Sequence, residues 1–541
     1  MRYFVKRPAV ASVILLAAAS LAAGGCGSNS STADCLSKHA AGAATAGWAL
    51  PGGDLQNTRD VASPINSSNV STLGVAWCVP IEATTPSGAT NGYATTPVVV
   101  NGVVYTQDLQ SNVMAIELAT GKVLWTHNYH SPNGGPDGVN VVGGTVYTAT
   151  DNAAVALSAA TGRQLWSRTL TGNDHEGIDM TPGYNNGTVY VSTVPVNPAV
   201  GEYLGHAKGT LWALNARTGA PEWSWDEVQD LWGNPGINSG GGLWDPPSFD
   251  RQGNLYIGVA NPGPIGQTGW PKGYPWGTSR PGPDLYTDSV VKLSPQGKLL
   301  WYYQLTPHDL YDWDLQNSPV LTTAHGQPVV IDAGKAGIVI ELSAQTGKLL
   351  WKLPVGVHSG HDNDGLITEN ATPTSAIPLP ARFELEPGVF GGVESQLATN
   401  GSTTFAAVNN LAVPMSVKGV TESSAAFLAS IGKATGEMVA VDQDTGKIVW
   451  DDKLPATPYG AAAVTNDIVF TTTYNGDLYA FNAATGVILL KRPLSAGTNA
   501  PVTIAGDYII TAASAPKSNG QQALIIAYKL GARGKVPDPL G

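Results

Sequence analysis

Cysteine and charged residues are both scarce in this chain. Its 541 residues include three cysteines, and 13% are charged, against about 25% in an average soluble domain. No Cys-x-x-Cys-His motif occurs, which excludes a covalently attached c-type haem, and the cysteines cannot form a zinc site. The formal net charge is −12. Nucleic acid is therefore not an expected partner, because a face that binds it must be basic.

Turn-forming residues are plentiful instead, and they belong to a repeat. The chain contains 64 glycines and 38 prolines. The pattern A-x-x-x-x-T-G-x-x-x-W recurs with small variations, in copies that end at Trp125, Trp166, Trp223, Trp301, Trp351 and Trp450. A degenerate copy ends at Leu490, and Trp77 in GVAWCV marks the closing strand of one more copy. Self-similarity at about 40–50 residues indicates a propeller or a solenoid.

Each copy has the local pattern of short antiparallel strands. Alternating apolar residues, as in VVYTQDLQSNVMAIEL, predict two strands, and a Thr-Gly turn leads into a third that ends in tryptophan. Four strands form one twisted blade, and the repeat span of 47–530 holds about eight blades. We therefore predict an all-β fold, an eight-bladed β-propeller of four-stranded antiparallel blades, with the tryptophans packed between blades. The alternative is a generic β-sandwich.

The spacing between tryptophans also predicts two insertions. The two longest gaps follow Trp223 and Trp351, and we place the insertions at about 224–285 and 352–430. Loops of this length in a compact domain are usually functional. The first includes three aromatic residues, in GWPKGYPWG, that could roof the channel or dock a protein.

The N-terminus has the pattern of a targeting segment. Arg2, Lys6 and Arg7 precede the apolar stretch AVASVILLAAASLAA, which leads to Cys26 and a polar tract. This resembles a bacterial lipoprotein signal, in which the cysteine becomes the lipidated first residue. An ordinary secretory signal is the alternative. In both cases the protein is expected outside the cytoplasm, anchored to the membrane through lipid on Cys26 or secreted.

These patterns divide the chain into three parts. We predict a lipoprotein signal peptide over 1–25, a flexible linker over 26–46 and the propeller over 47–541. Because disulfides form outside the cytoplasm, Cys35 in the linker and Cys78 in the first repeat strand are expected to bond. This bridge would tie the N-terminal arm to the propeller.

Several segments carry a more specific signal than the repeat itself. They read GWALPGGDLQNTRDVASPINSSNVSTLGVAW, GGGLWDPPSFDRQGNLYIGVANPGP, PGPDLYTDSVVKLSPQGKLLWYYQLTPHDLYDWDLQNSPVL, VVIDAGKAGIVIEL and YGAAAVTNDIVFTTTYNGDLYAFNAATG. Over nearly the whole mature chain they resemble the pyrroloquinoline quinone (PQQ)-dependent alcohol dehydrogenases. The resemblance implies an eight-bladed propeller that binds PQQ and a metal ion and oxidises an alcohol, a polyol or a sugar. It also implies an external electron acceptor such as a cytochrome c.

The resemblance also implies roles for individual residues. Trp244, in GGGLW, matches the tryptophan that stacks on the quinone, and Asn261, in GVANPGP, matches a metal-ligating asparagine. Asp312, in TPHDLYDWD, matches the catalytic aspartate, which is also a metal ligand. Lys335, in AGKAG, matches the basic residue that contacts the quinone oxygens. Glu202, in GEYLGHAKG, matches the metal-ligating glutamate, although its segment is longer here by two residues.

These residue types suit the implied chemistry. A hard cation takes oxygen ligands and would polarise a quinone carbonyl as a Lewis acid. Asp312 would accept the hydroxyl proton of the substrate while hydride moves to the quinone, and Lys335 would stabilise the developing charge. Asp314 stands where lanthanide-preferring methanol dehydrogenases carry an additional aspartate, so we expect it as a further metal ligand. The expected cation is calcium or a lanthanide.

Two other departures from the family pattern leave alternatives open. The adjacent cysteine pair that covers the other face of the quinone is missing, and the corresponding stretch, GGPDGVNVVGG, has no sulfur. Glu394, in GGVES, replaces the usual asparagine of a G-G-x-N-W segment. The alternatives to an enzyme are a non-catalytic scaffold lipoprotein, similar to the outer-membrane assembly lipoprotein that has the same repeats, and a binding module that uses the channel without redox chemistry.

Overall fold

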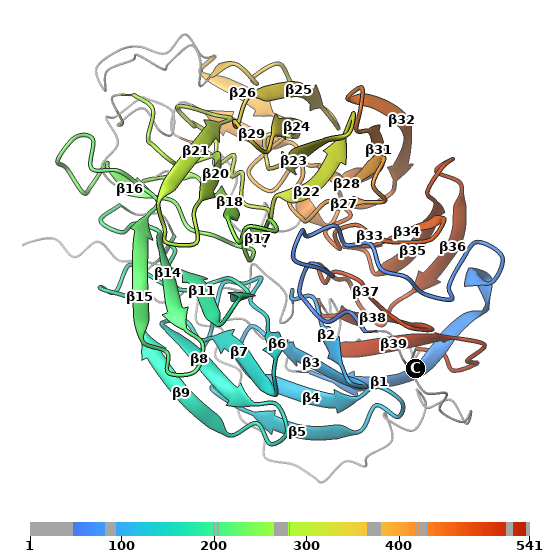
Figure 1. The fold of residues 1–541 in the computed structure, drawn as a ribbon. Helices are drawn as coiled ribbons and strands as arrows, with labels where there is room; N and C mark the ends of the chain where they lie inside the picture. Colours follow the sequence, from blue (N-terminus) through green and yellow to red (C-terminus); the bar gives the residue numbers. More distant parts are fainter. Residues whose placement is uncertain are drawn as a thin grey trace, which may run out of the picture.

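The fold is a closed ring of small β-sheets. The computed structural model describes residues 47–81, 94–197, 201–202, 205–264, 280, 282–364, 380–416, 419–420, 430–515 and 523–536. Within these ranges, eight four-stranded antiparallel sheets surround one axis (Figure 1). This confirms the predicted eight-bladed β-propeller. The described residues contain no helix long and apolar enough to cross a membrane.

Each blade runs from an inner strand near the axis to an outer strand at the rim, and the outer strands of blades 1 to 7 are largely exposed. Blade 1 consists of β2 (Val98–Val100), β3 (Val103–Gln107), β4 (Val113–Glu117) and β5 (Val123–His127), and blade 2 of β6 (Asn140–Val142), β7 (Thr145–Ala149), β8 (Ala153–Ser158) and β9 (Gln164–Thr169). Blade 3 consists of β10 (Gly183–Asn185), β11 (Thr188–Ser192), β14 (Thr210–Asn215) and β15 (Pro221–Asp226), and blade 4 of β17 (Ser248–Phe249), β18 (Leu255–Val259), β20 (Ser289–Leu293) and β21 (Leu299–Gln304). Blade 5 consists of β22 (Val320–Ala324), β23 (Gln327–Ala333), β24 (Ile338–Ser343) and β25 (Leu349–Pro354), and blade 6 of β27 (Ala398–Thr399), β28 (Thr403–Asn410), β31 (Thr435–Asp442) and β32 (Lys447–Leu454). Blade 7 consists of β33 (Ala463–Thr465), β34 (Ile468–Thr473), β35 (Asp477–Asn482) and β36 (Ile488–Pro493), and blade 8 of β37 (Thr503–Ala505), β38 (Tyr508–Ala513), β39 (Leu524–Leu530) and β1 (Leu73–Pro80).

The two ends of the chain close the ring. β1 precedes every other strand in the sequence, yet it is the outer strand of blade 8 and pairs antiparallel with β39. In Figure 1 the blue strand β1 therefore lies beside the red strand β39. Trp77 is in β1, which confirms that its segment closes one more copy of the repeat. A short helix, η1 (Val70–Thr72), leads into this strand.

The repeated tryptophans join neighbouring blades. Each indole N–H donates to a backbone carbonyl oxygen in the turn of the next blade, in the pairs Trp77–Leu118, Trp125–Ala159, Trp166–Ala216, Trp223–Pro295, Trp301–Ala344, Trp351–Gln443 and Trp450–Ala483. The glycine of the same turn lies against the ring, so that a Cβ on Gly162, for example, would be 2.5 Å from the Trp125 ring. These contacts confirm the predicted packing between blades. They also explain why the repeat combines T-G with W.

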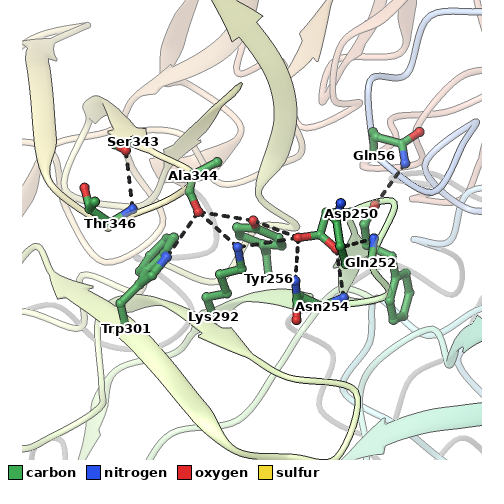
Figure 2. A network of polar contacts seen from close by, with 11 residues as sticks. Gln56, Asp250, Gln252, Asn254, Tyr256, Lys292, Trp301, Ser343, Ala344 and Thr346 are labelled. Carbon is green, nitrogen blue, oxygen red and sulfur yellow. Dashed lines mark hydrogen bonds and ion pairs between the residues drawn. The ribbon is translucent and has the colours of Figure 1, made fainter. Parts of the chain in front are cut away.

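The interface between blades 4 and 5 carries an additional polar network (Figure 2). The Ala344 carbonyl oxygen accepts hydrogen bonds from Trp301 Nε1 at 3.2 Å, Lys292 Nζ at 3.1 Å and the Tyr256 hydroxyl at 3.3 Å. Lys292 Nζ also lies 4.7 Å from the centre of the Tyr256 ring and 3.4 Å from Asp250 Oδ2. The Lys292 side chain is almost fully buried. Its contacts with the carbonyl oxygen, the carboxylate and the aromatic ring offset the free-energy cost of removing the ammonium group from water.

The predicted insertions were too long. Residues 224–285 contain two blade strands, β17 and β18, and residues 352–430 contain β27 and β28. The inner strands β17 and β27 have only two residues each, too few to show an alternation of apolar and polar side chains. Besides the blades, the described residues form three small sheets: β12 (Val196–Asn197) with β13 (Gly201–Glu202), β16 (Ser239–Gly240) with β19 (Pro262–Gly263), and β26 (Arg382–Leu385) with β29 (Val413–Ser416) and β30 (Gly419–Val420). The GWPKGYPWG aromatics lie outside the described residues.

The N-terminal segment crosses the propeller axis before it enters η1. Carbonyl oxygens of this segment accept backbone N–H groups from the inner strands of five blades, in the pairs Trp48–Val99, Leu55–Phe249, Gln56–Leu321, Thr58–Thr399 and Arg59–Val464. The Arg59 side chain is fully buried and its guanidinium group lies 5.1 Å from the centre of the Trp48 ring. The segment thus plugs the channel and ties separate blades together.

The cysteines are only partly within the described structure. Cys78, in β1, is disulfide-bonded. Cys35 and Cys26 lie outside the described residues, as do the predicted signal peptide (1–25) and linker (26–46). The Cys35–Cys78 pairing and the lipidation of Cys26 therefore stay predictions.

Candidate cofactor and active site

One cavity of about 190 Å³ lies at an end of the channel, and every blade contributes to it. Its wall is built from the eight segments that join the outer strand of one blade to the inner strand of the next. Their lining residues are Ala94, Thr96, Gly134, Gly135, Pro136, Asp137, Thr181, Trp244, Asp245, Asp312, Asp314, Gln316, Phe390, Glu394, Ser395, Gln396, Tyr459, Asn499 and Pro501. Lys335 and Val196 come from hairpins within blades 5 and 3, and Pro51 comes from the N-terminal plug.

Asp314 connects three of the predicted site segments. Its carbonyl oxygen accepts the backbone N–H of Lys335 at 2.9 Å, and its Oδ1 accepts the backbone N–H of Asn261 at 2.6 Å. Its Oδ2 lies 2.5 Å from Lys335 Nζ. A Cβ on Gly334 would lie 1.9 Å from the Asp314 carbonyl oxygen, so only glycine permits this approach. The A-G-K-A-G sequence therefore places the lysine against the aspartate.

Asp312 also contacts this lysine. Its Oδ2 is 3.4 Å from Lys335 Nζ, and its backbone φ is +63°, a left-handed conformation that is uncommon for residues other than glycine. Strained backbone of this kind clusters at functional sites. Burial lowers the pKa of Lys335, but the carboxylates of Asp312, Asp314 and Glu394 outweigh it and leave the pKa well above its ordinary value. Lys335 is therefore a cation in this site.

Trp244 follows a run of three glycines, each with a positive φ. The Ala260 N–H donates to the Gly242 carbonyl oxygen at 3.0 Å, and the Gly241 N–H donates to the Asn261 carbonyl oxygen at 2.9 Å. These bonds fasten the Trp244 segment to the Asn261 segment within blade 4. The indole ring is half-buried in the cavity wall.

The other predicted metal ligands are placed in part. Asn261 is fully buried, does not line the cavity, and has an Oδ1 atom without a hydrogen-bond partner among the described residues. Glu202 pairs in β13 with Val196, a cavity-lining residue, but its side chain lies outside the described structure. The described histidine, cysteine, aspartate and glutamate side chains form no group of three or more that could hold a metal ion.

These residues nevertheless fit a hard cation. The unpartnered Asn261 Oδ1 is an oxygen donor, and its own backbone binds Asp314, so an amide and a carboxylate are held together. Asp312 adds a second carboxylate, which contacts the same lysine as Asp314. A complete ligand set would also need Glu202 or oxygens from the bound cofactor.

Sequence reasoning missed the role of Asp245. It lines the cavity next to Trp244, and its Oδ1 accepts a hydrogen bond from Gln396 Nε2 at 2.5 Å. Gln396 Oε1 in turn accepts one from Arg59 Nη1 at 2.5 Å. Burial raises the pKa of Asp245 to about 6, while Gln396 and Arg59 oppose the rise. Arg59, in the N-terminal segment that plugs the channel, thus supports the cavity wall at Asp245. Sequence reasoning missed this contact because no local motif connects residues so far apart in the chain.

The stretch without cysteines also belongs to the cavity. Gly134, Gly135, Pro136 and Asp137 line it, at the connection between blades 1 and 2. Asp137 is buried, and neither of its carboxylate oxygens has a partner among the described residues. This part of the wall therefore consists of glycine backbone, a proline ring and a buried carboxyl group.

Comparison with known families agrees with this architecture. The PQQ model described as the β-propeller domain of glucose, ethanol and alcohol dehydrogenases matches residues 48–141 and 181–387, more than half of the chain. A second model, described as the outer membrane protein assembly factor BamB, matches residues 434–527.

Individual proteins extend the similarity. A quinohemoprotein alcohol dehydrogenase from Comamonas testosteroni is 28% identical over 519 residues, covering 84% of this chain and 70% of the relative. The chain covers 66% of the length of two related dehydrogenase subunits. The crystal structure of the Comamonas testosteroni enzyme superimposes with a TM-score of 0.74 at 24% identity, covering 92% of this chain and 82% of that one. A europium-containing methanol dehydrogenase gives a TM-score of 0.69 at 18% identity, with 90% and 98% covered. The chain therefore belongs to the family of PQQ-dependent alcohol dehydrogenases.

Proposed function

We propose that this chain is an extracytoplasmic PQQ-dependent dehydrogenase that oxidises the hydroxyl group of an alcohol, a polyol or a sugar. The observation that carries the proposal is the cavity in which Trp244, Asp312, Asp314 and Lys335 meet. They come from two inter-blade connections and one hairpin, and a scaffold has no need of this combination.

The proposed roles follow from the placement of each side chain. Asp312 lines the cavity, so it can accept the hydroxyl proton of a bound alcohol. The Lys335 ammonium lies against two carboxylates and faces the same space, where it would stabilise negative charge on a ligand oxygen. Trp244 offers a flat aromatic wall for a planar ring. Bound PQQ supplies a quinone carbonyl that accepts hydride, and a bound metal ion supplies a Lewis acid that polarises it.

The metal would be held by Asn261, Asp312, Asp314 and Glu202. Calcium and lanthanide ions are both hard cations that take oxygen ligands, and the second aspartate favours the ion of higher charge. A methanol dehydrogenase of similar fold is described as containing europium. We therefore propose that the site accepts either class of ion and that Asp314 decides between them.

The partners follow from the reaction and from the N-terminus. The substrate would be a small alcohol, polyol or sugar, and the electrons would leave to an external acceptor such as a cytochrome c, since the chain has no haem-attachment motif. The lipoprotein-like N-terminus supports attachment to the outer face of a membrane through Cys26.

The decisive test uses the purified protein with PQQ and either Ca²⁺ or La³⁺. We expect calorimetry to detect metal-dependent PQQ binding, and we expect the loaded protein to reduce an artificial dye when a simple alcohol is added. The apoprotein with the alcohol alone is the control. Absence of PQQ binding with either metal would replace this proposal with the scaffold interpretation, to which the match over residues 434–527 would then apply.

A further inference from the structure

A second cavity, of about 240 Å³, lies beside blade 5. Trp313 lines it, whereas its neighbours in the chain, Asp312 and Asp314, line the cofactor cavity. In the same way Ala336 lines the second cavity and the preceding residue, Lys335, lines the first. No described residue lines both, so the two spaces are separate, and these two chain segments form the wall between them.

Most of the second cavity is apolar. Its Trp313 ring is buried and held in place, because Nε1 donates to the Pro387 carbonyl oxygen at 3.1 Å and the ring packs edge-on against Tyr311 at 5.1 Å. Apolar side chains make up six of the ten described lining residues: Leu305, Pro307, Trp313, Ala336, Ile338 and Pro354. A dry cavity of about 150 Å³ admits benzene, so this one has room for a six-membered ring and a polar group.

One cation of the lining has no counter-charge. Lys352, on the outer strand β25, is exposed at the edge of the cavity and forms no ion pair with another described residue. Thr306 and Asn363 add hydrogen-bond donors to the lining. A negatively charged ligand group would therefore find a charged partner at this edge.

The Asp362 carboxylate, which also lines the cavity, is already paired. Its Oδ1 lies 2.6 Å from His358 Nδ1, and Nε2 of the same imidazole lies 3.0 Å from the Val355 carbonyl oxygen. Both ring nitrogens face acceptors, so both donate and the imidazole is a cation. Burial lowers the pKa of His358, but Asp362 and the carbonyl groups of Val355 and Gly337 outweigh it and leave the pKa above its ordinary value. The uncompensated charge in the lining is thus that of Lys352.

We propose that this cavity is a second ligand site, for a small organic anion that combines an apolar ring with one carboxylate group. The ring would lie against Trp313, Ala336 and Ile338, where it would gain the packing contacts that an unfilled apolar space forfeits. The carboxylate would pair with the Lys352 ammonium group. The site is distinct from the cofactor cavity, so this inference does not depend on the proposed function.

Calorimetric titration of the purified protein with sodium benzoate tests the proposal, without added PQQ or metal. We expect a dissociation constant below about 1 mM, which is within reach of a ligand of this size. Benzamide has the ring without the charge, and acetate has the charge without the ring. Each should bind at least about tenfold more weakly than benzoate, because each loses one of the two contacts.

Two lysine variants locate the benzoate. Lys352→Gln removes the charge at an exposed position, and should weaken benzoate binding by about tenfold or more while it leaves benzamide binding unchanged. Lys348→Gln is the matched control, since Lys348 is also exposed, immediately precedes the same strand and does not line the cavity. It should change neither affinity.

A third measurement repeats the benzoate titration after saturation with PQQ and Ca²⁺. Full retention of benzoate affinity supports a separate site, whereas its loss would place benzoate in the cofactor cavity and overturn the inference. The inference is also wrong if the wild type binds no benzoate, if acetate binds as tightly, or if Lys348→Gln and Lys352→Gln weaken binding equally. If the wild type takes up no PQQ but binds benzoate in the way that depends on Lys352, the proposed function falls and this site remains.

Discussion

Lys335 Nζ lies 2.5 Å from Asp314 Oδ2, while the other oxygen of the same carboxylate accepts the backbone N–H of Asn261. One aspartate therefore links the proposed quinone-contacting residue to a proposed metal ligand. A metal ion at Asp314 and the lysine would share a single carboxylate, so the affinity of the site for a cation and the position of the ammonium group depend on each other.

Asp312→Asn should abolish most of the turnover while leaving the cavity intact. Asparagine tolerates the positive φ of this position and keeps the shape, but its amide cannot accept a proton. We expect kcat to fall by about 10²–10⁴-fold, the usual contribution of a positioned base. Steady-state kinetics on the PQQ-loaded protein measures this, with PQQ binding by calorimetry as the check on cofactor occupancy. An equal loss in Asp226→Asn, an exposed site on β15, would assign the effect to something other than the base.

The fold was predictable because the same short-range contacts recur. Each copy of the repeat contains a Thr-Gly turn and a tryptophan. The glycine of one blade packs against the tryptophan ring of the preceding blade, so the residues that form the interface between blades are the residues that define the repeat. The strands β17 and β27 have two residues each, too few to show an alternation of apolar and polar side chains. The predicted insertions therefore included these two strands.

The site was predictable only where a family motif exists. Trp244, Asp312, Asp314 and Lys335 were identified from their local sequences, and the structure brings them to one cavity. The Asp245 carboxylate is connected to the Arg59 guanidinium by two hydrogen bonds through the Gln396 side chain. Arg59 is 186 positions earlier in the sequence than Asp245. Long-range contacts of this kind follow from closure of the ring.

Gly162→Ala should destabilise the propeller more than Gly531→Ala. Both glycines have a similar positive φ, +69° and +75°, so alanine pays the same conformational cost of about 1–2 kcal/mol at each. A Cβ on Gly162 also meets the Trp125 ring, whereas one on Gly531 meets no atom within 4 Å. We expect an additional loss of about 1–3 kcal/mol for Gly162→Ala, from overpacking at the blade interface. Urea unfolding followed by tryptophan fluorescence compares the two, and equal midpoints would contradict this account of the repeat.

Cys26→Ala should release the mature protein from the membrane. The N-terminal segment resembles a lipoprotein signal, so lipid on Cys26 is the predicted anchor. Fractionation of cells should find the wild type with the membranes and Cys26→Ala in the soluble fraction, and Cys35→Ser serves as the matched control that keeps the anchor. Intact-mass measurement of the mature N-terminus checks the lipid directly. Membrane retention of Cys26→Ala would favour an uncleaved signal or a protein partner instead.

Asp314→Ala should change the metal preference of the site. A trivalent ion gains more than a divalent ion from each added carboxylate, so the loss of this one should weaken La³⁺ binding more than Ca²⁺ binding, by at least about tenfold in the ratio of affinities. The variant also removes one of the two carboxylates that Lys335 contacts, an effect that acts equally on both metals. Calorimetric titration of each metal in the presence of PQQ gives the ratio, and the rates of dye reduction should follow it. Asp245→Asn removes a charge from the same cavity at a carboxylate held by Gln396, and it should leave the ratio unchanged. If Asp314→Ala and Asp245→Asn lower both metal affinities in the same proportion, Asp314 acts through the overall charge of the cavity and not as a ligand.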